Sequence, residues 1–130
     1  MILTYKQIVD SIPAMKELCS REDIPFLTSL KLSKNAIEID KYAAHYQSEY
    51  NKILQECLEK DENGNYIAEH DDPQLGFKII PEKREILEKK LETLGDFETD
   101  VTIEVIPKEE FEGINISPNN VRKILFLIGE

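Results

Sequence analysis

Residues 59–73 read EKDENGNYIAEHDDP and gather the side chains best suited to hold a metal ion, with six carboxylates and three amide or imidazole groups. A calcium-binding EF-hand loop needs glycine at its sixth position and glutamate at its twelfth. Counted from Asp61, the sixth position is Tyr66 and the twelfth is Asp72. The glycine comes early, at Gly64, so the sharp turn is misplaced. The sequence therefore predicts a turn that ends a helix, and no calcium site.

The EHDD stretch at 69–72 contains ligands that a transition metal accepts, but such a site needs three or four ligands that converge. The only other histidine is His45, and Cys19 and Cys57 fall on apolar faces of helical patterns. The chain also lacks a G-x-S-x-G nucleophile motif and a glycine-rich phosphate loop. We therefore predict no bound metal, no cofactor and no catalytic residues. The protein is predicted not to be an enzyme.

The size and composition predict one domain over residues 1–130, since a chain of 130 residues can bury a core without disulfides or metal. Two cysteines are too few for a disulfide framework and favour a reducing compartment. No apolar run approaches the roughly 20 residues that cross a bilayer. The start, MILTYKQIVD, lacks the features of a signal peptide. We expect a cytoplasmic protein without membrane contact.

The net charge of −10 is unevenly placed along the chain. Residues 1–43 carry six basic and six acidic side chains, whereas residues 44–130 carry ten basic and twenty acidic ones. Such a surface repels nucleic-acid phosphates, so we expect no direct nucleic-acid binding. It suits either simple solubility or a protein partner that has a basic groove.

The first half of the sequence is typical of helices. Thr4 and Gln7 form a capping box for a first helix, which Pro13 is predicted to kink or split. A second, long helix begins between Pro25 and Ser33 and continues to Lys60. Its apolar positions repeat in heptads: Leu32, Ala36, Ile39, Ala43, Tyr46, Tyr50, Ile53 and Cys57.

A heptad seam of this kind must be covered by another helix. The favoured interpretation is an antiparallel helical hairpin within the chain. The alternative is a homo-oligomer that associates through Ile39, Tyr46, Tyr50 and Ile53.

The second half mixes short strands with helices. YIAEH and LGFKII could pair as a hairpin, and Pro81 opens a third helix that ends near Gly95. Residues 101–105 alternate apolar and polar side chains, which predicts a half-buried strand. Ser117 and Pro118 open a last helix that bears Val121, Ile124, Leu125 and Ile128. The predicted fold is α+β: a helical N-terminal half, a small antiparallel sheet of two or three strands, and two further helices.

An acidic band covers residues 92–112. On a strand, Asp100 and Glu104 would share an outward face, and Glu109 and Glu110 follow. These four carboxylates are the predicted partner-binding residues. Carboxylates two residues apart on a strand face would be spaced about 7 Å, which resembles every second phosphate of one DNA strand, although an ordinary solvated face is the favoured interpretation.

The order of segments resembles a family of small, acidic, uncharacterised proteins encoded by phages and prophages of Gram-positive bacteria. The likeness covers residues 28–130 and rests on the Lys34–Asn35 pair, the long charged helix, the DENG turn at Asp61–Gly64 and the strand that leads to the Ser117-capped helix. This resemblance implies a phage product acting in a bacterial cytoplasm or in virion assembly, and it implies no catalytic residues.

Two functional hypotheses follow. The first is a non-enzymatic acidic protein that binds and inhibits a host protein, such as a nuclease or a defence factor. The alternative is a structural or assembly accessory of the phage particle that self-associates through the heptad helix.

Overall fold

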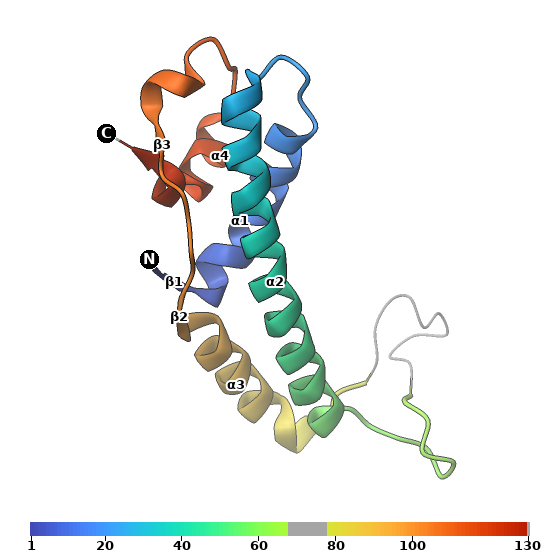
Figure 1. Ribbon diagram of the computed structural model, residues 1–130. Coiled ribbons are helices and arrows are strands. Elements are labelled where there is room, and N and C mark those ends of the chain that lie inside the picture. Colours follow the sequence, from blue (N-terminus) through green and yellow to red (C-terminus); the bar gives the residue numbers. More distant parts are fainter. Residues whose placement is uncertain (68–77, 130) are drawn as a thin grey trace. The chain divides into compact units, whose positions relative to one another are not determined.

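A computed structural model describes residues 1–67 and 78–129 and divides the chain into two compact units (Figure 1). Unit 1 comprises Met1–His45 and Asp96–Glu130, and unit 2 comprises Tyr46–Gly95. Each unit is described by itself below. A single domain over residues 1–130 stays a prediction.

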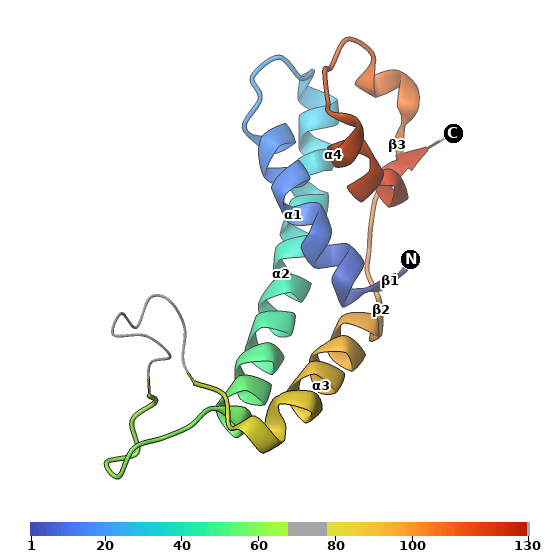
Figure 2. The ribbon, with the colours of Figure 1, turned by 180° about the vertical axis from the view of Figure 1, so that it is seen from behind.

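The chain forms four α-helices in the described residues, together with short strands and 3-10 turns (Figures 1 and 2). The helices are α1 (Tyr5–Cys19), α2 (Phe26–Cys57), α3 (Arg84–Asp96) and α4 (Pro118–Lys123). The strands are β1 (Ile2–Thr4), β2 (Glu98–Asp100), β3 (Ile106–Pro107) and β4 (Ile128–Gly129). The 3-10 turns are η2 (Pro81–Lys83), η3 (Lys108–Phe111) and η4 (Leu125–Leu127). The predicted α+β class is confirmed.

Helix α1 begins with the predicted capping box. The Thr4 hydroxyl accepts a hydrogen bond from the Gln7 amide at 3.1 Å, and the Gln7 side chain accepts one from the Thr4 amide at 2.9 Å. The helix runs past Pro13 without interruption, so the predicted split does not occur. One turn is supported by Ser11, whose buried hydroxyl donates to the Ile8 carbonyl at 2.6 Å.

The core of unit 1 lies where α1, α2 and the C-terminal segment meet. Its fully buried apolar side chains are Ile8, Leu18, Leu32, Ile39, Val101, Ile106, Ile124 and Leu127. Burial of one such aliphatic side chain contributes about 1.5–3 kcal/mol. The first half of the heptad seam is therefore covered within the chain, as the favoured interpretation expected.

Two small sheets belong to unit 1. Strand β1 pairs antiparallel with β2, with Ile2 opposite Asp100. Strand β3 pairs parallel with β4, with Ile106 opposite Ile128. The strand predicted over 101–105 is misplaced, because these residues lie between β2 and β3 and in neither of them. The predicted alternation holds for the buried Val101 and fails at Val105, which is exposed while its neighbour Ile106 is buried.

The last helix is shorter than predicted. Ser117 caps α4 by accepting a hydrogen bond from the Asn120 amide at 3.3 Å, and Pro118 occupies the first turn, as expected. The helix ends at Lys123, and Ile128 lies in β4 instead of on a helical face. The reason is tertiary, since pairing with β3 requires extended backbone at the C-terminal end.

In unit 2, the predicted turn after α2 is confirmed. The Asp61 carboxylate accepts hydrogen bonds from the backbone amides of Asn63 at 2.9 Å and Asn65 at 3.0 Å. Gly64 adopts φ +81°, a left-handed conformation that favours glycine. The tip of the predicted hairpin and the EHDD stretch fall in residues 68–77, outside the described residues.

Helix α2 carries a row of polar side chains beside its apolar seam. We call Thr28, Lys31, Asn35 and Tyr42 the polar row of α2. Each of them bonds to the segment that runs from β2 to η3. The segment passes alongside α2 in the direction opposite to the helix (Figures 1 and 2).

Asn35 makes the most demanding of these contacts. Its amide nitrogen donates to the Glu104 carbonyl at 2.9 Å, and its amide oxygen accepts from the Glu104 backbone N–H at 2.9 Å. Only 1% of Asn35 is exposed, so water cannot replace either bond. The Asn35 side chain thus satisfies the backbone N–H and carbonyl of Glu104, as a neighbouring β-strand would.

Replacement of Asn35 by Ala should lower the free energy of unfolding by about 2–3 kcal/mol, because it removes two hydrogen bonds and leaves backbone groups of Glu104 without partners. Urea denaturation measures this change. Asn51 is the matched control, because it is exposed on the same helix, and Asn51→Ala should change stability little. Equal losses in the two variants would contradict the role of Asn35.

Candidate functional site

The candidate site is the acidic segment, which we define as residues 96–112. It contains seven carboxylates and a single cation, Lys108. The polar row of α2 positions its backbone in the middle, where Asn35 bonds Glu104 and the Tyr42 hydroxyl donates to the Asp100 carbonyl at 3.0 Å. Asn35 and Tyr42 are separated by about 10 Å along the helix, and Asp100 and Glu104 by up to about 13 Å of chain. The two spacings match when this part of the segment is nearly extended.

The four predicted partner-binding carboxylates do not share one environment. Glu104 and Glu109 are exposed, and neither makes a side-chain bond to the described residues. Asp100 is exposed too, and its Oδ1 lies 2.8 Å from the backbone nitrogen of Met1. Glu110 instead faces α2. Whether these residues bind a partner stays a prediction, and the structure places two of them where a partner can reach them freely.

Glu110 is held by two members of the polar row. Lys31 pairs with its Oε2 at 2.9 Å, and the Thr28 hydroxyl donates to its Oε1 at 2.8 Å. The bond to Lys31, followed by the bond to Thr28, lowers the pKa of Glu110 below its ordinary value. This carboxylate therefore anchors the acidic segment to α2.

Apolar side chains are interspersed with the outward carboxylates. Phe97 is 59% exposed, although its ring stacks on Tyr5 at a centroid distance of 5.8 Å. Val105 and Ile2 are also exposed, and Ile2 sits opposite Asp100 in the β1–β2 pair. Protein interfaces combine an apolar core with a polar rim, and this surface exposes side chains of both kinds.

The predicted self-association seam lies in mixed surroundings. Ile39 is buried in the core of unit 1. Tyr46, Tyr50 and Ile53 are half-buried in unit 2, and the rings of Tyr46 and Tyr50 are 5.8 Å apart. Self-association through these residues stays a prediction.

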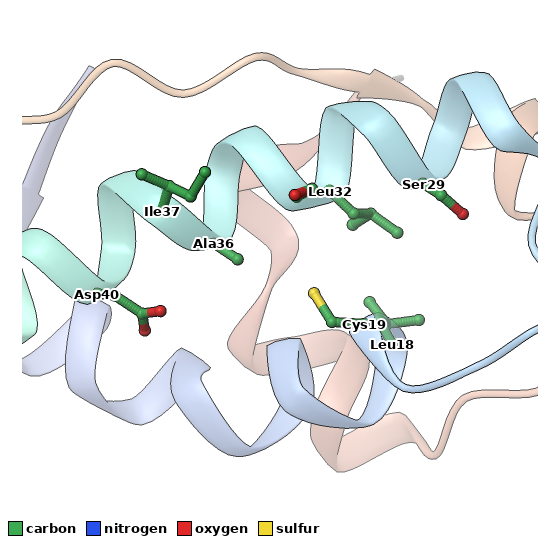
Figure 3. A pocket seen from close by; sticks show the side chains of 8 residues that line it. Leu18, Cys19, Ser29, Leu32, Ala36, Ile37 and Asp40 are labelled. Atoms are coloured by element: carbon green, nitrogen blue, oxygen red, sulfur yellow. The ribbon is translucent and has the colours of Figure 1, made fainter.

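A second feature is a groove between α1 and α2, with a volume of about 250 Å³ (Figure 3). Small side chains on α2, among them Ser29 and Ala36, form its floor, and Leu18 and Ile37 contribute apolar walls. A smaller hollow of about 130 Å³ continues along α1 and shares Cys19, Ala36 and Asp40 with it. The groove is shaped to receive apolar groups.

Cys19 lines this groove together with the hydroxyls of Ser29 and Ser33, and its sulfur points toward α2 (Figure 3). Burial raises the pKa of the Cys19 thiol, and the carboxylate of Asp40 raises it further. A thiol with a raised pKa stays protonated at neutral pH and is a weak nucleophile. The thiol of Cys19 is therefore poorly suited to nucleophilic attack at neutral pH.

The described residues contain no cluster of three or more His, Cys, Asp or Glu side chains able to hold a metal ion. In the DENGN turn, Oδ1 of Asp61 already accepts two backbone hydrogen bonds, so its geometry serves the turn. Residues 69–72 lie outside the described part of the chain, and the prediction for them is unchanged.

Sequence reasoning missed the polar row. A signal was present, because Thr28, Leu32, Asn35 and Ile39 follow helical steps of 4, 3 and 4, and a polar residue on such a buried stripe needs a partner. The identity of that partner could not be predicted, since Glu104 lies 69 residues further along the chain.

A scan against protein-family models found no match, and searches of curated proteins and of solved structures found no similar protein. The resemblance to phage proteins therefore stays a prediction. None of the helices in residues 1–67 and 78–129 has the length and apolar composition required to cross a membrane.

The Lys31–Glu110 pair predicts a pH effect on stability. Because its folded-state pKa is lowered, Glu110 stabilises the fold above its ordinary pKa of 4.5, and this contribution is lost as the pH falls through the lowered value. The variant Glu110→Gln should be less stable than the wild type at neutral pH, and the difference should shrink between about pH 5 and pH 3. Urea denaturation across this range measures it.

Glu109→Gln provides the control for this experiment, because Glu109 is the exposed neighbour without a side-chain partner among the described residues. Its stability should follow the wild type at each pH. If the two variants showed the same pH dependence, Glu110 would have no special part in holding the segment.

Proposed function

We propose that this chain is a non-enzymatic interaction protein that binds a basic protein surface through the acidic segment. One observation carries the proposal: Glu98, Glu104, Glu109 and Glu112 are exposed and have no side-chain partner among the described residues, on a backbone that α2 holds in place. The weakly reactive thiol of Cys19 supports a binding role over a catalytic one.

Carboxylates on a backbone that is held in place are better suited to recognition than carboxylates on a mobile tail. Binding to a preformed surface avoids the entropic cost of ordering the chain at that moment. A row of like charges also steers an oppositely charged partner and accelerates its association, in a salt-dependent manner. The exposed Phe97 and Val105 add apolar contact area beside these charges.

The biological role follows from the resemblance to phage proteins. In this proposal the chain acts in the cytoplasm of a bacterial host and inhibits a host protein with a basic groove, such as a nuclease or a defence factor. An acidic surface that occupies such a groove competes with nucleic acid for the same cations. A virion-associated role is the alternative.

The proposal predicts how charge changes affect binding. A variant with Glu98, Glu104, Glu109 and Glu112 changed to Gln should capture the partner from bacterial lysate at least about fourfold less well, because each exposed ion pair contributes about 0.2–1 kcal/mol. The captured wild-type complex should also dissociate between low and moderate salt. Quantitative pull-down at several salt concentrations measures both effects.

The matched control changes four exposed carboxylates of unit 2 to Gln, namely Glu62, Glu82, Glu88 and Glu92. Both variants then carry a net charge of −6 in place of −10. The control should bind like the wild type. If both variants lost binding equally, net charge and not the acidic segment would determine binding. If the wild type captured no partner that dissociates with salt, the proposal would be wrong.

Self-association is a second candidate function, and exposed apolar side chains near the start of α2 favour it. Phe26 is 78% exposed and Ile37 is 66% exposed, with Leu27 and Leu30 also exposed. They lie in residues 1–43, whose charges balance, so two copies can approach there without strong repulsion. In this alternative, the copies meet through the first half of α2.

Light scattering at roughly 50 µM tests the alternative, since dimerisation depends on protein concentration. Self-association predicts a dimer for the wild type and a monomer for Phe26→Glu. Ile86→Glu, which changes an exposed apolar residue of α3, should leave the dimer intact. A monomeric wild type would exclude this second candidate at that concentration.

A further inference from the structure

A second hollow in unit 1 lies away from both the acidic segment and the α1–α2 groove. It has a volume of about 430 Å³. Gln7 and Asp10 of α1 form one side, and Arg122, Lys123, Leu125 and Phe126 form the other. Pockets for small ligands usually occupy about 300–1,000 Å³, so the hollow is large enough for one.

The walls of this hollow adjoin buried core residues of unit 1. Ile8 lies next to Gln7 in sequence and is fully buried, and so are Ile124 and Leu127, which flank Leu125 and Phe126. Packing of this kind holds the neighbouring backbone in place. The hollow is therefore preformed on a rigid base.

The charged side chains that line the hollow favour binding of an anion. Neither Arg122 nor Lys123 forms an ion pair with a described residue, although the Asp10 carboxylate lines the same hollow. Two cations against one carboxylate give the lining of the hollow a net positive charge, in a chain whose net charge is −10.

The other side chains that line the hollow favour a ligand that carries a base and a sugar as well as an anionic group. The ring of Phe126 is half-buried and offers a flat apolar surface, on which a nucleic-acid base can stack. Arginine binds phosphate oxygens with paired N–H groups, and lysine adds a compact charge. A carboxylate such as Asp10 can accept hydrogen bonds from ribose hydroxyls.

From this combination we propose that the hollow binds a nucleoside monophosphate. Arg122 and Lys123 would hold the phosphate, Phe126 would stack on the base, and Asp10 would accept a ribose hydroxyl. The site does not depend on the acidic segment and shares no residue with it. It is consistent with the expectation that nucleic-acid strands are repelled, because a single nucleotide presents one phosphate to one local cation pair.

The test is a titration of the full chain, followed by NMR amide shifts and by calorimetry, with adenosine monophosphate, adenosine and inorganic phosphate as separate probes. The monophosphate should bind with a dissociation constant below about 1 mM and shift the amides around the hollow. Adenosine alone and phosphate alone should each bind at least about tenfold more weakly. Equal binding of phosphate alone would overturn the role of Phe126 and leave a simple anion site.

Variants locate the site. Arg122→Gln combined with Lys123→Gln should weaken the monophosphate at least about tenfold, and Phe126→Leu should weaken it while leaving phosphate binding unchanged. Lys34→Gln combined with Lys108→Gln is the matched control, because it removes two exposed cations of unit 1 outside the hollow and should change nothing. Thermal unfolding of each variant verifies that it folds. No amide shifts at millimolar nucleotide, or unchanged affinity in the double variant, would overturn the proposal.

Discussion

The bidentate pairing of Asn35 with the backbone of Glu104 is the interaction on which the arrangement of unit 1 depends. A buried side-chain amide takes both polar groups of one residue in a stretch that has no strand beside it. Without it, those groups would lie unpaired against an apolar core, at a cost of about 1–3 kcal/mol each. The pairing holds the chain between β2 and β3 along α2.

The other members of the polar row extend this constraint in both directions. Tyr42 fixes the segment at Asp100, and Lys31 with Thr28 fixes it at Glu110. Once three points along the segment are held, the side chains between them have little choice of direction. Val101 and Ile106 enter the core, and Glu104 is left facing solvent. The outward direction of Glu104 and Glu109 therefore follows from how the segment is attached, and these two carboxylates belong to the surface to which we assign partner binding.

Much of the local structure could be predicted from the sequence because short-range chemistry determines it. The capping box at Thr4, the Ser117–Pro118 helix start and the Asp61 turn all depend on contacts within a few residues. The strand over 101–105 was misplaced because an alternating pattern indicates burial on one side and says nothing about what pairs the backbone. Here a side chain on α2 does so. Strand β1 was missed for a related reason, since it pairs with residues almost the length of the chain away.

Amide hydrogen exchange at Glu104 tests the central claim most directly. Its N–H belongs to no strand or helix, yet the Asn35 side chain should protect it. The amide of Thr102 lies in the same segment and donates no hydrogen bond to a described residue. We expect the Glu104 amide to exchange at least about tenfold more slowly than the Thr102 amide. Equal exchange rates at Glu104 and Thr102 would show that Asn35 does not hold the segment, and the fixed acidic surface would lose its physical basis.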